Sequence, residues 1–302
     1  MPYLFKVDHK IKILIFGASG YLGQIITRHL SSKYQVTAVV RPTSRISEAF
    51  SKENIKLLRV DQNEWANCVS EVKPNYVICA QWDGVEKQHR NNLEKQYSNV
   101  DAQLLIANKA VDENVSGFIA FGSQAEFTPS ASKIPELESC NPESHYGRSK
   151  TILLERLKTI FAESNTRFIW ARVFSIYGPL DPSDSLINGV VSAIISGENY
   201  DIENPEKLWS FLYEADFAAA IDVILSQESI NGIVNVANPD LVRLAEVASF
   251  ARIPCNLNKS NADSHTDIGF KPETLKLQYA GWAAKFNLEE GLTATLQHRQ
   301  IS

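Results

Sequence analysis

Cysteine and long apolar runs are both scarce in this sequence. The four cysteines, Cys68, Cys79, Cys140 and Cys255, are widely scattered and form no CxxC pair. This spacing favours buried or idle thiols in a reducing cytoplasm, and we expect no metal site. No uninterrupted apolar run is long enough to span a bilayer. The first ten residues have charges inside a short apolar stretch and no cleavage-site pattern, so we predict no signal peptide, no membrane partner and a cytoplasmic protein.

The sequence also lacks an excess of positive charge. Its 30 lysines and arginines against 35 aspartates and glutamates give a formal net charge of −5. A protein that binds nucleic acid normally carries a basic face, so this balance argues against nucleic acid as the main partner. A hydrophobic fraction of 44% in 302 residues is sufficient for a real core in one large domain or two intimate domains.

What the first half does contain is an alternation of short β-branched runs with longer amphipathic stretches. The runs typical of strands are 11–16, 35–40, 55–60, 75–80, 116–121 and 167–173. Helical periodicity covers 21–32, 99–114 and 144–164. Such strand–helix–strand repeats predict parallel pairing with right-handed crossovers and helices on both faces. The predicted fold class is therefore α/β, with a doubly wound parallel Rossmann sheet.

The stretch FGASGYLGQ places three glycines in the order GxxGxxG directly after the first predicted strand. Gly17 permits a sharp turn, Gly20 lets backbone N–H groups approach a pyrophosphate, and Gly23 lets the next helix lie close to the strand. The position between a strand and a helix indicates a dinucleotide site. We therefore predict that NAD(P) binds to this loop, at Gly17, Ser19, Gly20, Tyr21, Leu22 and Gly23.

The end of the second predicted strand bears on which dinucleotide is bound. NAD binders commonly place a carboxylate about 20 residues beyond the glycines, where it holds the ribose 2′-hydroxyl. Here the strand ends AVVRPTSR, with Arg41 in that place and Arg45 close behind. Because a guanidinium favours a phosphate, we predict NADP as the cofactor and NAD as the alternative. The competing interpretation is that Arg41 is a solvated charge at a strand end.

After Val173 the regular alternation is lost. The stretch 177–185 is rich in Pro, Asp and Ser, which predicts a loop. Further helices are expected at 186–197, 217–227 and near 288–298, and a further strand at 232–237. We predict a Rossmann domain of residues 1–174 plus about 208–236, and a smaller, sequence-interleaved α/β C-terminal substrate-binding lobe of residues 175–207 and 237–302.

Tyr146 and Lys150 stand one helical turn apart in the stretch HYGRSK. The spacing alone carries little information, because ten tyrosines and 30 basic residues in a chain of 302 predict about one such pair by chance. A catalytic interpretation of the pair therefore depends on the motifs around it.

Those motifs occur in a characteristic order along most of the chain. They are GASGYLG (17–23), Asp61 after the third strand, Asn99 at the opening of a helix, FGSQAEF (121–127), YGRSK (146–150), RVFSIYGP (172–179), WSFLYEADFAAAI (209–221), GW (281–282) and LEEGL (288–292). In this order they resemble the extended short-chain dehydrogenase/reductases, and more narrowly the NAD(P)-dependent epimerase/dehydratase family that acts on nucleotide-activated sugars.

The resemblance implies that Ser123, Tyr146 and Lys150 form the catalytic set of an enzyme. Tyr146 would donate a proton when a ketone is reduced, Lys150 would lower the pKa of Tyr146 and hold the ribose hydroxyls, and Ser123 would orient the carbonyl. Cofactor contacts are likewise implied for Asp61, Gln62, Ala80, Asn99, Lys150 and Val173, with Asp61 near the adenine and Ala80 near the nicotinamide ribose. The resemblance also implies a homodimer formed through a four-helix bundle of the helices at about 99–114 and 144–163.

The residues that follow Ser123 bear on the reaction. Family dehydratases carry an Asp–Glu pair there, whereas this chain has Gln124 and Ala125, which exchange no proton. Glu126 lies one position further and, if the strand continues, points in a different direction. We therefore predict an NADP-dependent reductase of a keto group on a nucleotide-activated deoxy sugar. A nucleotide-sugar epimerase of the same family and a non-catalytic NADP-sensing regulator are the alternatives.

Substrate contacts are expected near the carboxyl ends of the predicted strands. The candidates are Gln81, Trp82, Gln124, Phe174, Ser175, Trp209 and Arg243. The family often has an arginine where Trp209 stands, so the usual diphosphate anchor is in question and Arg243 is a candidate replacement. Trp209 also suits a core or interface position, and Arg243 also suits an exposed helix start.

Overall fold

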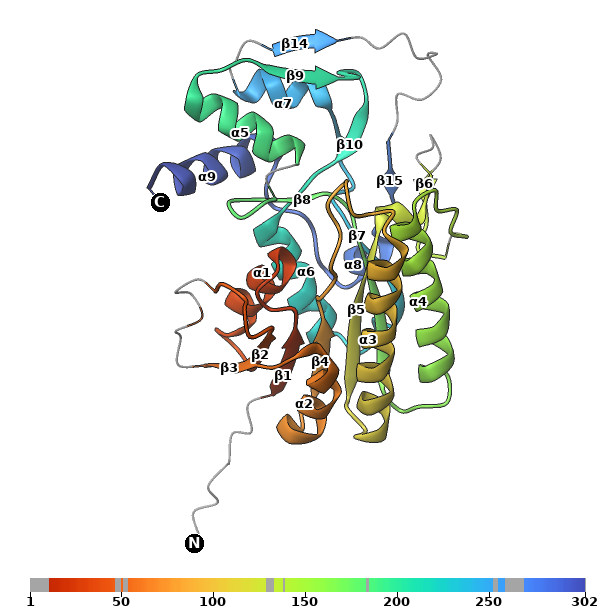
Figure 1. The fold of residues 1–302 in the computed structure, drawn as a ribbon. Coiled ribbons are helices and arrows are strands. Elements are labelled where there is room, and N and C mark those ends of the chain that lie inside the picture. Colours follow the sequence, from red (N-terminus) through yellow and green to blue (C-terminus); the bar gives the residue numbers. More distant parts are fainter. Residues whose placement is uncertain are drawn as a thin grey trace, which may run out of the picture.

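The computed structural model describes residues 11–46, 50, 54–128, 133–137, 139–182, 185–251, 255–258 and 269–301. Its central feature is a seven-stranded sheet in which every neighbouring pair of strands is parallel (Figure 1). In spatial order the strands are β12 (Gly232–Val236), β7 (Arg167–Val173), β5 (Gly117–Ser123), β4 (Tyr76–Cys79), β1 (Lys12–Phe16), β2 (Gln35–Val40) and β3 (Ile55–Arg59). The predicted doubly wound α/β fold is confirmed. The first ten residues, on which the signal-peptide prediction rests, lie outside the described residues.

The strand order reverses at β1, which pairs with β2 on one side and with β4 on the other. In open α/β sheets, ligands bind outside the carboxyl ends of the strands at such a reversal. Phe16 and Cys79 end β1 and β4 in register with each other. The loops that follow these two strands therefore meet at the place where a ligand is expected.

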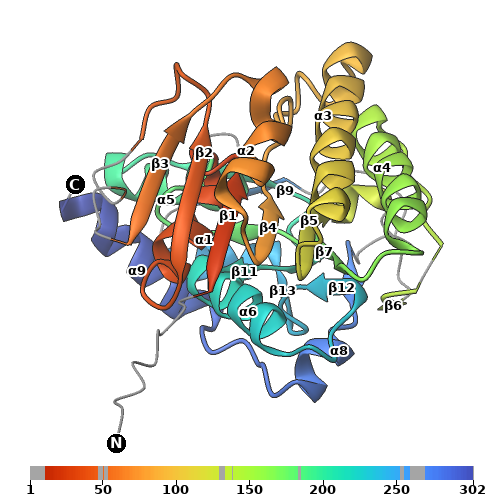
Figure 2. The same cartoon turned by 90° about the horizontal axis from the view of Figure 1, so that it is seen from below.

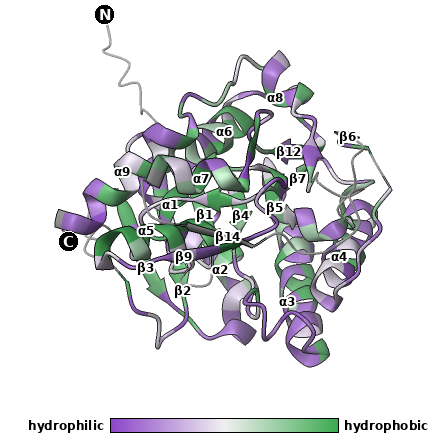
Figure 3. Ribbon diagram, turned by 90° about the horizontal axis from the view of Figure 1, so that it is seen from above, coloured by the Kyte–Doolittle hydropathy of each residue, from purple (hydrophilic) through white to green (hydrophobic). Residues whose placement is uncertain are grey.

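Helices cover both faces of this sheet (Figure 2). Helices α1 (Tyr21–Leu30) and α6 (Glu214–Ser226) cover one face, and α2 (Trp65–Val72), α3 (Leu93–Asp112) and α4 (His145–Phe161) cover the other. The sheet strands are almost wholly apolar because both of their faces are buried. Seen from above (Figure 3), the outer helices α3 and α4 instead alternate hydrophobic and hydrophilic residues.

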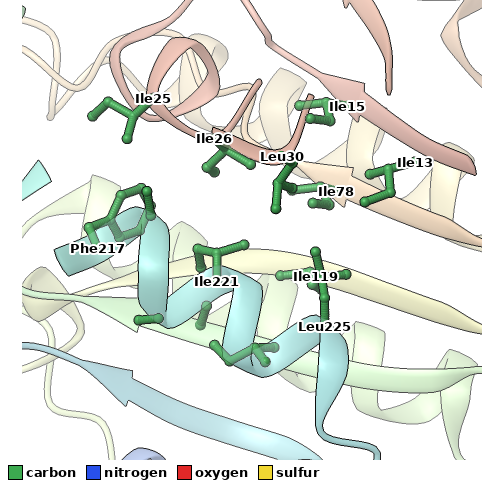
Figure 4. Packing of buried hydrophobic residues seen from close by; sticks show 14 of the residues in the cluster. Ile13, Ile15, Ile25, Ile26, Leu30, Ile78, Ile119, Phe217, Ile221 and Leu225 are labelled. Atoms are coloured by element: carbon green, nitrogen blue, oxygen red, sulfur yellow. The ribbon is translucent and has the colours of Figure 1, made fainter. Parts of the chain in front are cut away.

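The interface between α1, α6 and the sheet shows how tightly the first face is closed. Figure 4 shows apolar side chains from both helices meeting side chains of the strands, namely Ile25, Ile26, Leu30, Phe217, Ile221, Leu225, Ile13, Ile15, Ile78 and Ile119. Each such side chain contributes about 1.5–3 kcal/mol by leaving water. This packing fixes α1, and with it the glycine loop at the beginning of α1.

A smaller group of elements lies above the sheet in Figure 1. It contains α5 (Leu186–Ser196), α7 (Leu244–Ala251) and α9 (Leu288–Ile301), the pair β9 (Tyr200–Glu203) and β14 (Cys255–Asn258), and the pair β10 (Leu208–Ser210) and β13 (Leu241–Arg243). Val190, Val191 and Val247 are fully buried in its apolar core. We refer to these elements as the upper lobe.

Short strand pairs connect segments that are distant in the sequence. Strand β8 (Ile176–Tyr177) pairs with β11 (Leu212–Tyr213), and β6 (Lys133–Ile134) pairs with β15 (Lys271–Pro272), which precedes α8 (Leu275–Tyr279). The chain leaves the main sheet after β7 and returns through β11, α6 and β12. The upper lobe is therefore tied to the sheet by several crossings of the chain.

Polar side chains determine where three of the helices begin. Ser144, Asn92 and Ser185 each accept a hydrogen bond from a backbone N–H in the first turn of α4, α3 and α5, respectively. Because α3 begins at Leu93 under the Asn92 cap, the prediction that Asn99 opens this helix is wrong. Helix α2 was not predicted from the sequence, and α6 begins at Glu214, before the expected start at 217.

Within the described ranges, no helix is both long enough and apolar enough to cross a membrane. Across the same part of the chain, no group of three or more His, Cys, Asp or Glu residues is arranged to hold a metal ion.

Candidate active site

The glycine loop between β1 and α1 has a backbone that only glycine accommodates. Gly17 adopts a φ of +73°, and a Cβ on it would lie 2.4 Å from the backbone nitrogen of Gln81. A Cβ on Gly23 would lie 2.1 Å from the carbonyl oxygen of Gly17. No side chain caps the first turn of α1, which begins after Gly20. Its free N–H groups and the positive end of the helix dipole therefore suit an anion such as a pyrophosphate.

A cleft opens at the point where the loops after β1 and β4 meet. The residues that line it are Gly17, Ser19, Gly20, Arg41, Gln62, Trp65, Ala80, Gln81, Trp82, Asp83 and Asn99. The remaining predicted cofactor residues, Tyr21, Leu22, Gly23, Arg45, Asp61, Lys150 and Val173, are not part of this lining. Trp65 and Asp83 were missed by the sequence analysis. Trp65 begins α2, an element that the sequence pattern did not indicate.

Arg41 is exposed at the edge of this cleft. Within the described residues, no hydrogen bond or ion pair engages its guanidinium. The loop after β2 is instead held by Arg59, which donates to the carbonyl oxygens of Pro42 and Ser44. Ser44 also connects this loop to the glycine loop, through a 3.1 Å hydrogen bond from Ser19. Arg41 is thus placed beside the cleft on a braced loop, and Arg59 is a bracing residue that the sequence did not reveal.

The loop between β4 and α3 is braced by polar side chains on the inner face of α3. Asn99 accepts from the backbone N–H of Asp83 and donates to its carbonyl oxygen, both at 2.8 Å. Gln96 accepts from the indole of Trp82 at 2.8 Å, and Gln103 donates to the carbonyl oxygen of Gln81 at 3.0 Å. In this structure the Asn99 amide holds the loop, and its contact with a cofactor stays a prediction.

The three predicted catalytic residues are brought together by β5 and α4. Ser123 ends β5, and Tyr146 and Lys150 lie in the first turns of α4; all three side chains are buried. Lys150 donates to the carbonyl oxygen of Phe121 at 2.8 Å, and its Nζ lies 3.4 Å from the centre of the Trp82 ring. Trp82 also meets the edge of the Tyr146 ring, at 5.8 Å between ring centres. Trp82 therefore links the cleft to the candidate catalytic residues Tyr146 and Lys150.

Burial and neighbouring groups both act on the pKa of Tyr146. Burial raises the pKa of Tyr146 above its ordinary value, while a hydrogen bond from Ser123 and the positive charge of Arg90 act to lower it. Burial also lowers the pKa of Lys150 to about 7, against the negative charge of Glu126. Lys150 is consequently only partly charged near neutral pH. Arg90 lowers the pKa of Tyr146 in this structure. Lys150 Nζ lies 5.8 Å from the centre of the Tyr146 ring, and its own effect on that pKa stays a prediction.

Arg90 reaches Tyr146 from the loop before α3. Its carbonyl oxygen accepts from the Tyr146 backbone N–H at 2.9 Å, and its guanidinium carbon lies 5.9 Å from the centre of the Tyr146 ring. No local sequence pattern indicates this contact, because the two residues are far apart along the chain.

Ser123 is held in place by a buried ion pair. After Ser123 the strand gives way to a 3-10 turn, η3 (Gln124–Glu126). The Glu126 carboxylate accepts from the Ser123 backbone N–H at 2.7 Å, from the Arg172 guanidinium at 2.8 Å and from the Trp170 indole at 3.1 Å. Both Glu126 and Arg172 are fully buried. Glu126 is therefore a positioning residue for Ser123, with its carboxylate committed to Arg172. A strand that continues past Ser123 was considered from the sequence, whereas the chain turns there, and Arg172 was missed.

The predicted substrate residues fall into different environments. Gln81 and Trp82 line the cleft. Phe174 is fully buried against Phe270, which corrects its assignment as a substrate contact, because its ring has no surface left to offer. Arg243 is more than half exposed and pairs with Glu206 and Glu246, as expected of an arginine at a helix start. The remaining three, Gln124, Ser175 and Trp209, are joined by hydrogen bonds.

Comparison with known proteins gives consistent matches. A family model described as the NAD dependent epimerase/dehydratase family matches residues 13–237. The chain is 23% identical over 244 residues to CDP-abequose synthase of Yersinia pseudotuberculosis, covering 80% of this chain and 83% of the relative. It is 26% identical over 246 residues to dTDP-6-deoxy-L-talose 4-dehydrogenase (NAD(+)) of Aggregatibacter actinomycetemcomitans, covering 74% and 83%.

A solved structure supports the fold independently. The UDP-glucose 4-epimerase of Thermotoga maritima, solved with UDP-glucose, aligns with a TM-score of 0.83 at 19% identity, over 96% of this chain and 99% of that chain. At this identity the likeness concerns the fold, whereas the family model covers most of the chain, including the glycine loop and all three catalytic candidates. The chain therefore belongs to the NAD dependent epimerase/dehydratase family of enzymes.

Proposed function

We propose that the protein is an NADP-dependent reductase of a keto group on a nucleotide-activated deoxy sugar. The observation that carries the proposal is that Ser123, Tyr146 and Lys150 come together beside the cleft. Trp82, which lines the cleft, contacts both Tyr146 and Lys150. The names of the two curated relatives, which refer to a CDP-linked and a dTDP-linked sugar, support a nucleotide-linked substrate.

The cleft residues fit a dinucleotide. The uncapped first turn of α1 offers N–H groups to a pyrophosphate, and Gly17 and Gly20 leave room for it. Arg41 stands where a ribose 2′-phosphate would need a cation, on a strand end without a carboxylate. These features favour NADP; NAD is the alternative because one curated relative carries NAD(+) in its name.

The catalytic side chains would act on the carbonyl oxygen. When bound, the reduced nicotinamide supplies the hydride. Tyr146 donates its hydroxyl proton to the oxygen as negative charge builds there, and Ser123 donates a hydrogen bond to the same oxygen. Because burial raises the pKa of Tyr146, the phenol is fully protonated at neutral pH, as a proton donor must be. Lys150 Nζ, fixed by the Phe121 carbonyl, holds the ribose hydroxyls.

Sugar dehydration is disfavoured by the residues after Ser123. Gln124 and Ala125 exchange no proton, and the carboxylate of Glu126 is committed to Arg172 and to the Ser123 backbone. A dehydratase needs an acid and a base beside the sugar, in addition to the tyrosine. Epimerisation needs no such pair, so a nucleotide-sugar epimerase is the second candidate, favoured by the likeness to UDP-glucose 4-epimerase.

One assay separates these activities. The purified protein is incubated with NADPH and a series of nucleotide 4-keto-6-deoxy sugars, and NADPH absorbance is followed together with product formation. NADPH consumption equal to the sugar converted supports the reductase. A product without net consumption supports the epimerase. No conversion of any sugar, with NADPH still bound, supports the NADP-sensing regulator instead.

The quaternary structure and location belong to the same proposal. A homodimer through α3 and α4 would form a four-helix bundle, and the exposed Tyr97 and Leu105 on α3 offer apolar surface for it. These two helices already lie side by side in Figures 1 and 2. We propose a cytoplasmic dimer.

A further inference from the structure

Three side chains form a hydrogen-bonded chain that ends next to the catalytic serine. The Trp209 indole Nε1 donates to Ser175 Oγ at 2.6 Å, and Ser175 Oγ donates to Gln124 Oε1 at 3.2 Å. Gln124 directly follows Ser123. The three residues come from β10, from the turn after β7, and from η3, so the chain joins the upper lobe to the main sheet. We call it the Trp209 chain.

The beginning of the Trp209 chain is held rigidly. The Trp209 ring packs edge-on against Phe270 at 5.4 Å between ring centres, and the Lys207 ammonium lies 4.6 Å from the centre of the ring. A Cβ on Gly269 would lie 2.2 Å from the ring, so the backbone there closes over the indole. Trp209 therefore cannot turn its N–H away without repacking its surroundings.

The middle of the chain sits on unusual backbone. Ser175 has a φ of +33°, in the region that residues other than glycine, asparagine and aspartate rarely adopt. Its carbonyl oxygen accepts from the Leu212 backbone N–H at 3.1 Å, which ties this conformation to β11. Strain of this kind persists where surrounding contacts fix it, often at functional sites.

The chemistry of the three groups fixes the direction of the chain. An indole nitrogen can only donate, so Ser175 Oγ accepts from Trp209 and gives its single proton to Gln124. The Gln124 carbonyl oxygen is thereby occupied, and the amide must present its two N–H donors on the other side. Among the described residues, none accepts a hydrogen bond from Gln124 Nε2. The free end of the chain is thus a donor, on the residue that directly follows Ser123.

We propose that the Trp209 chain sets substrate selectivity, by presenting the Gln124 amide as a fixed donor to a sugar oxygen beside the reacting carbon. The proposal rests on the proposed reductase function. A sugar with a hydroxyl or carbonyl oxygen at that position is accepted, and one that lacks the oxygen leaves the donor unpaired and reacts more slowly. Gln124 contacts the substrate, whereas Trp209 and Ser175 are positioning residues.

The chain itself is tested without any substrate. The sequence has five tryptophans, so a ¹⁵N-labelled sample gives at most five indole N–H signals, and Trp209→Phe identifies the one from Trp209. Ser175→Ala removes its acceptor, and the signal is expected to move upfield and to exchange faster with solvent. Ser210→Ala is the matched control, because its hydroxyl donates to Asn238 outside the chain. If the Trp209 signal is unchanged in Ser175→Ala, the hydrogen bond from Trp209 to Ser175 does not form and the Trp209 chain does not exist.

Selectivity is tested with nucleotide-linked keto sugars that each lack one hydroxyl group. The wild type is expected to discriminate against one member by about tenfold or more in kcat/KM, as for one lost hydrogen bond. Trp209→Phe and Gln124→Glu should reduce kcat/KM for the sugar that keeps all of its hydroxyl groups. They should leave kcat/KM for the disfavoured sugar little changed, so that the difference between the two sugars disappears. Ser210→Ala should keep it.

Two outcomes count against the proposal in different ways. An equal loss of kcat/KM for every sugar in the Trp209→Phe variant shows a merely structural role and overturns the selectivity proposal. If the wild type converts no sugar, the reductase function and the selectivity fail together, whereas the indole signals still decide whether the chain exists.

Discussion

At the scale of single residues, Tyr146 and Lys150 show how burial changes the chemistry that a sequence motif suggests. The motif led us to expect a lysine that acidifies a tyrosine. In the folded chain both groups are buried, so each favours its uncharged form. Tyr146 is thereby kept as a phenol, and Arg90 adds a positive charge that lowers its pKa. The positions were predictable, whereas their ionisation depended on the packing around them.

Replacing Tyr146 with phenylalanine tests the proton donor directly. Tyr146→Phe keeps the ring that contacts Trp82 but removes the hydroxyl. We expect kcat to fall by about 10² to 10⁴, the contribution of a placed acid, with NADPH affinity unchanged in a fluorescence titration. Undiminished turnover would remove Tyr146 as the donor, and lost NADPH binding would point to a structural effect.

Lys150 makes stability depend on pH. The pKa of Lys150 is about 7 in the folded protein, whereas its ordinary value, expected in the unfolded chain, is 10.5. Between these two pH values the unfolded chain therefore binds more protons than the folded protein. The free energy of unfolding therefore rises with pH through this window, by at most about 1.4 kcal/mol per unit. Lys150→Met, which cannot ionise, should be more stable than the wild type below pH 7. The difference should narrow as the pH rises to 9.

Urea unfolding of both proteins at pH 6.5 and at pH 9, taken as nominal conditions about two units apart, measures this difference. A difference that is the same at both values would show that Lys150 is not the titrating group. In the proposed function Lys150 holds the ribose hydroxyls, so the variant should also be inactive.

Arg41 offers a test of cofactor choice at a single exposed side chain. Arg41→Ser should weaken NADPH binding by about tenfold to a hundredfold, the value of a lost charge-assisted hydrogen bond, and leave NADH binding unchanged. Arg45→Ser is the control, because Arg45 does not line the cleft. Titration of each variant with both dinucleotides is the measurement; equal weakening for both would contradict a role at the 2′-phosphate.

At the scale of elements, the six strands predicted from the first half correspond to β1, β2, β3, β4, β5 and β7. They were predictable because parallel strands buried on both faces give continuous apolar runs. Helix α2 is only eight residues long, and the first turns of α3 are largely polar. A helical pattern is therefore hard to recognise in these two segments from the sequence alone. The short strands of the upper lobe likewise depend on partners that are distant in the sequence.

Contacts between elements also explain which site residues were missed. Arg172 lies on β7 and reaches Glu126 in η3, and Arg90 reaches Tyr146 from another loop. Neither pair has a sequence spacing that a local pattern can detect. The glycine loop and the catalytic residues, in contrast, belong to contiguous motifs and could be identified from the sequence.

The ion pair between η3 and β7 should be important for stability. Glu126→Gln leaves the Arg172 guanidinium buried without a counter-charge, which should lower the free energy of unfolding by about 3–5 kcal/mol. Glu155→Gln, at an exposed pair with Lys158, should change it by less than about 1 kcal/mol. Urea unfolding of the two variants under identical conditions gives the comparison. Equal changes in the free energy of unfolding would mean that the buried ion pair contributes no more to stability than the exposed one.

At the scale of the whole molecule, the outer surface of α3 allows the proposed homodimer to be tested. Leu105 is 59% exposed on this helix, and a dimer through α3 and α4 would bury it. Leu105→Glu should therefore convert a dimer to a monomer in light scattering, because a charge would be placed in an apolar interface. Leu137→Glu is the control, since Leu137 is 84% exposed and lies outside both helices. If the wild-type protein is monomeric at every concentration measured, the proposed dimer is wrong.

The order of strands in the sheet has a consequence for synthesis of the protein. The edge strand β12 and the helix α6 that covers β1 and β5 are both translated after the first segment of the upper lobe. A nascent chain that ends near residue 174 would thus leave exposed the part of the apolar face of the sheet that α6 covers, because α1 covers only the rest of it. The ribosome must release residues through Val236 before that face is closed, so chaperone dependence should be greatest over this stretch of translation.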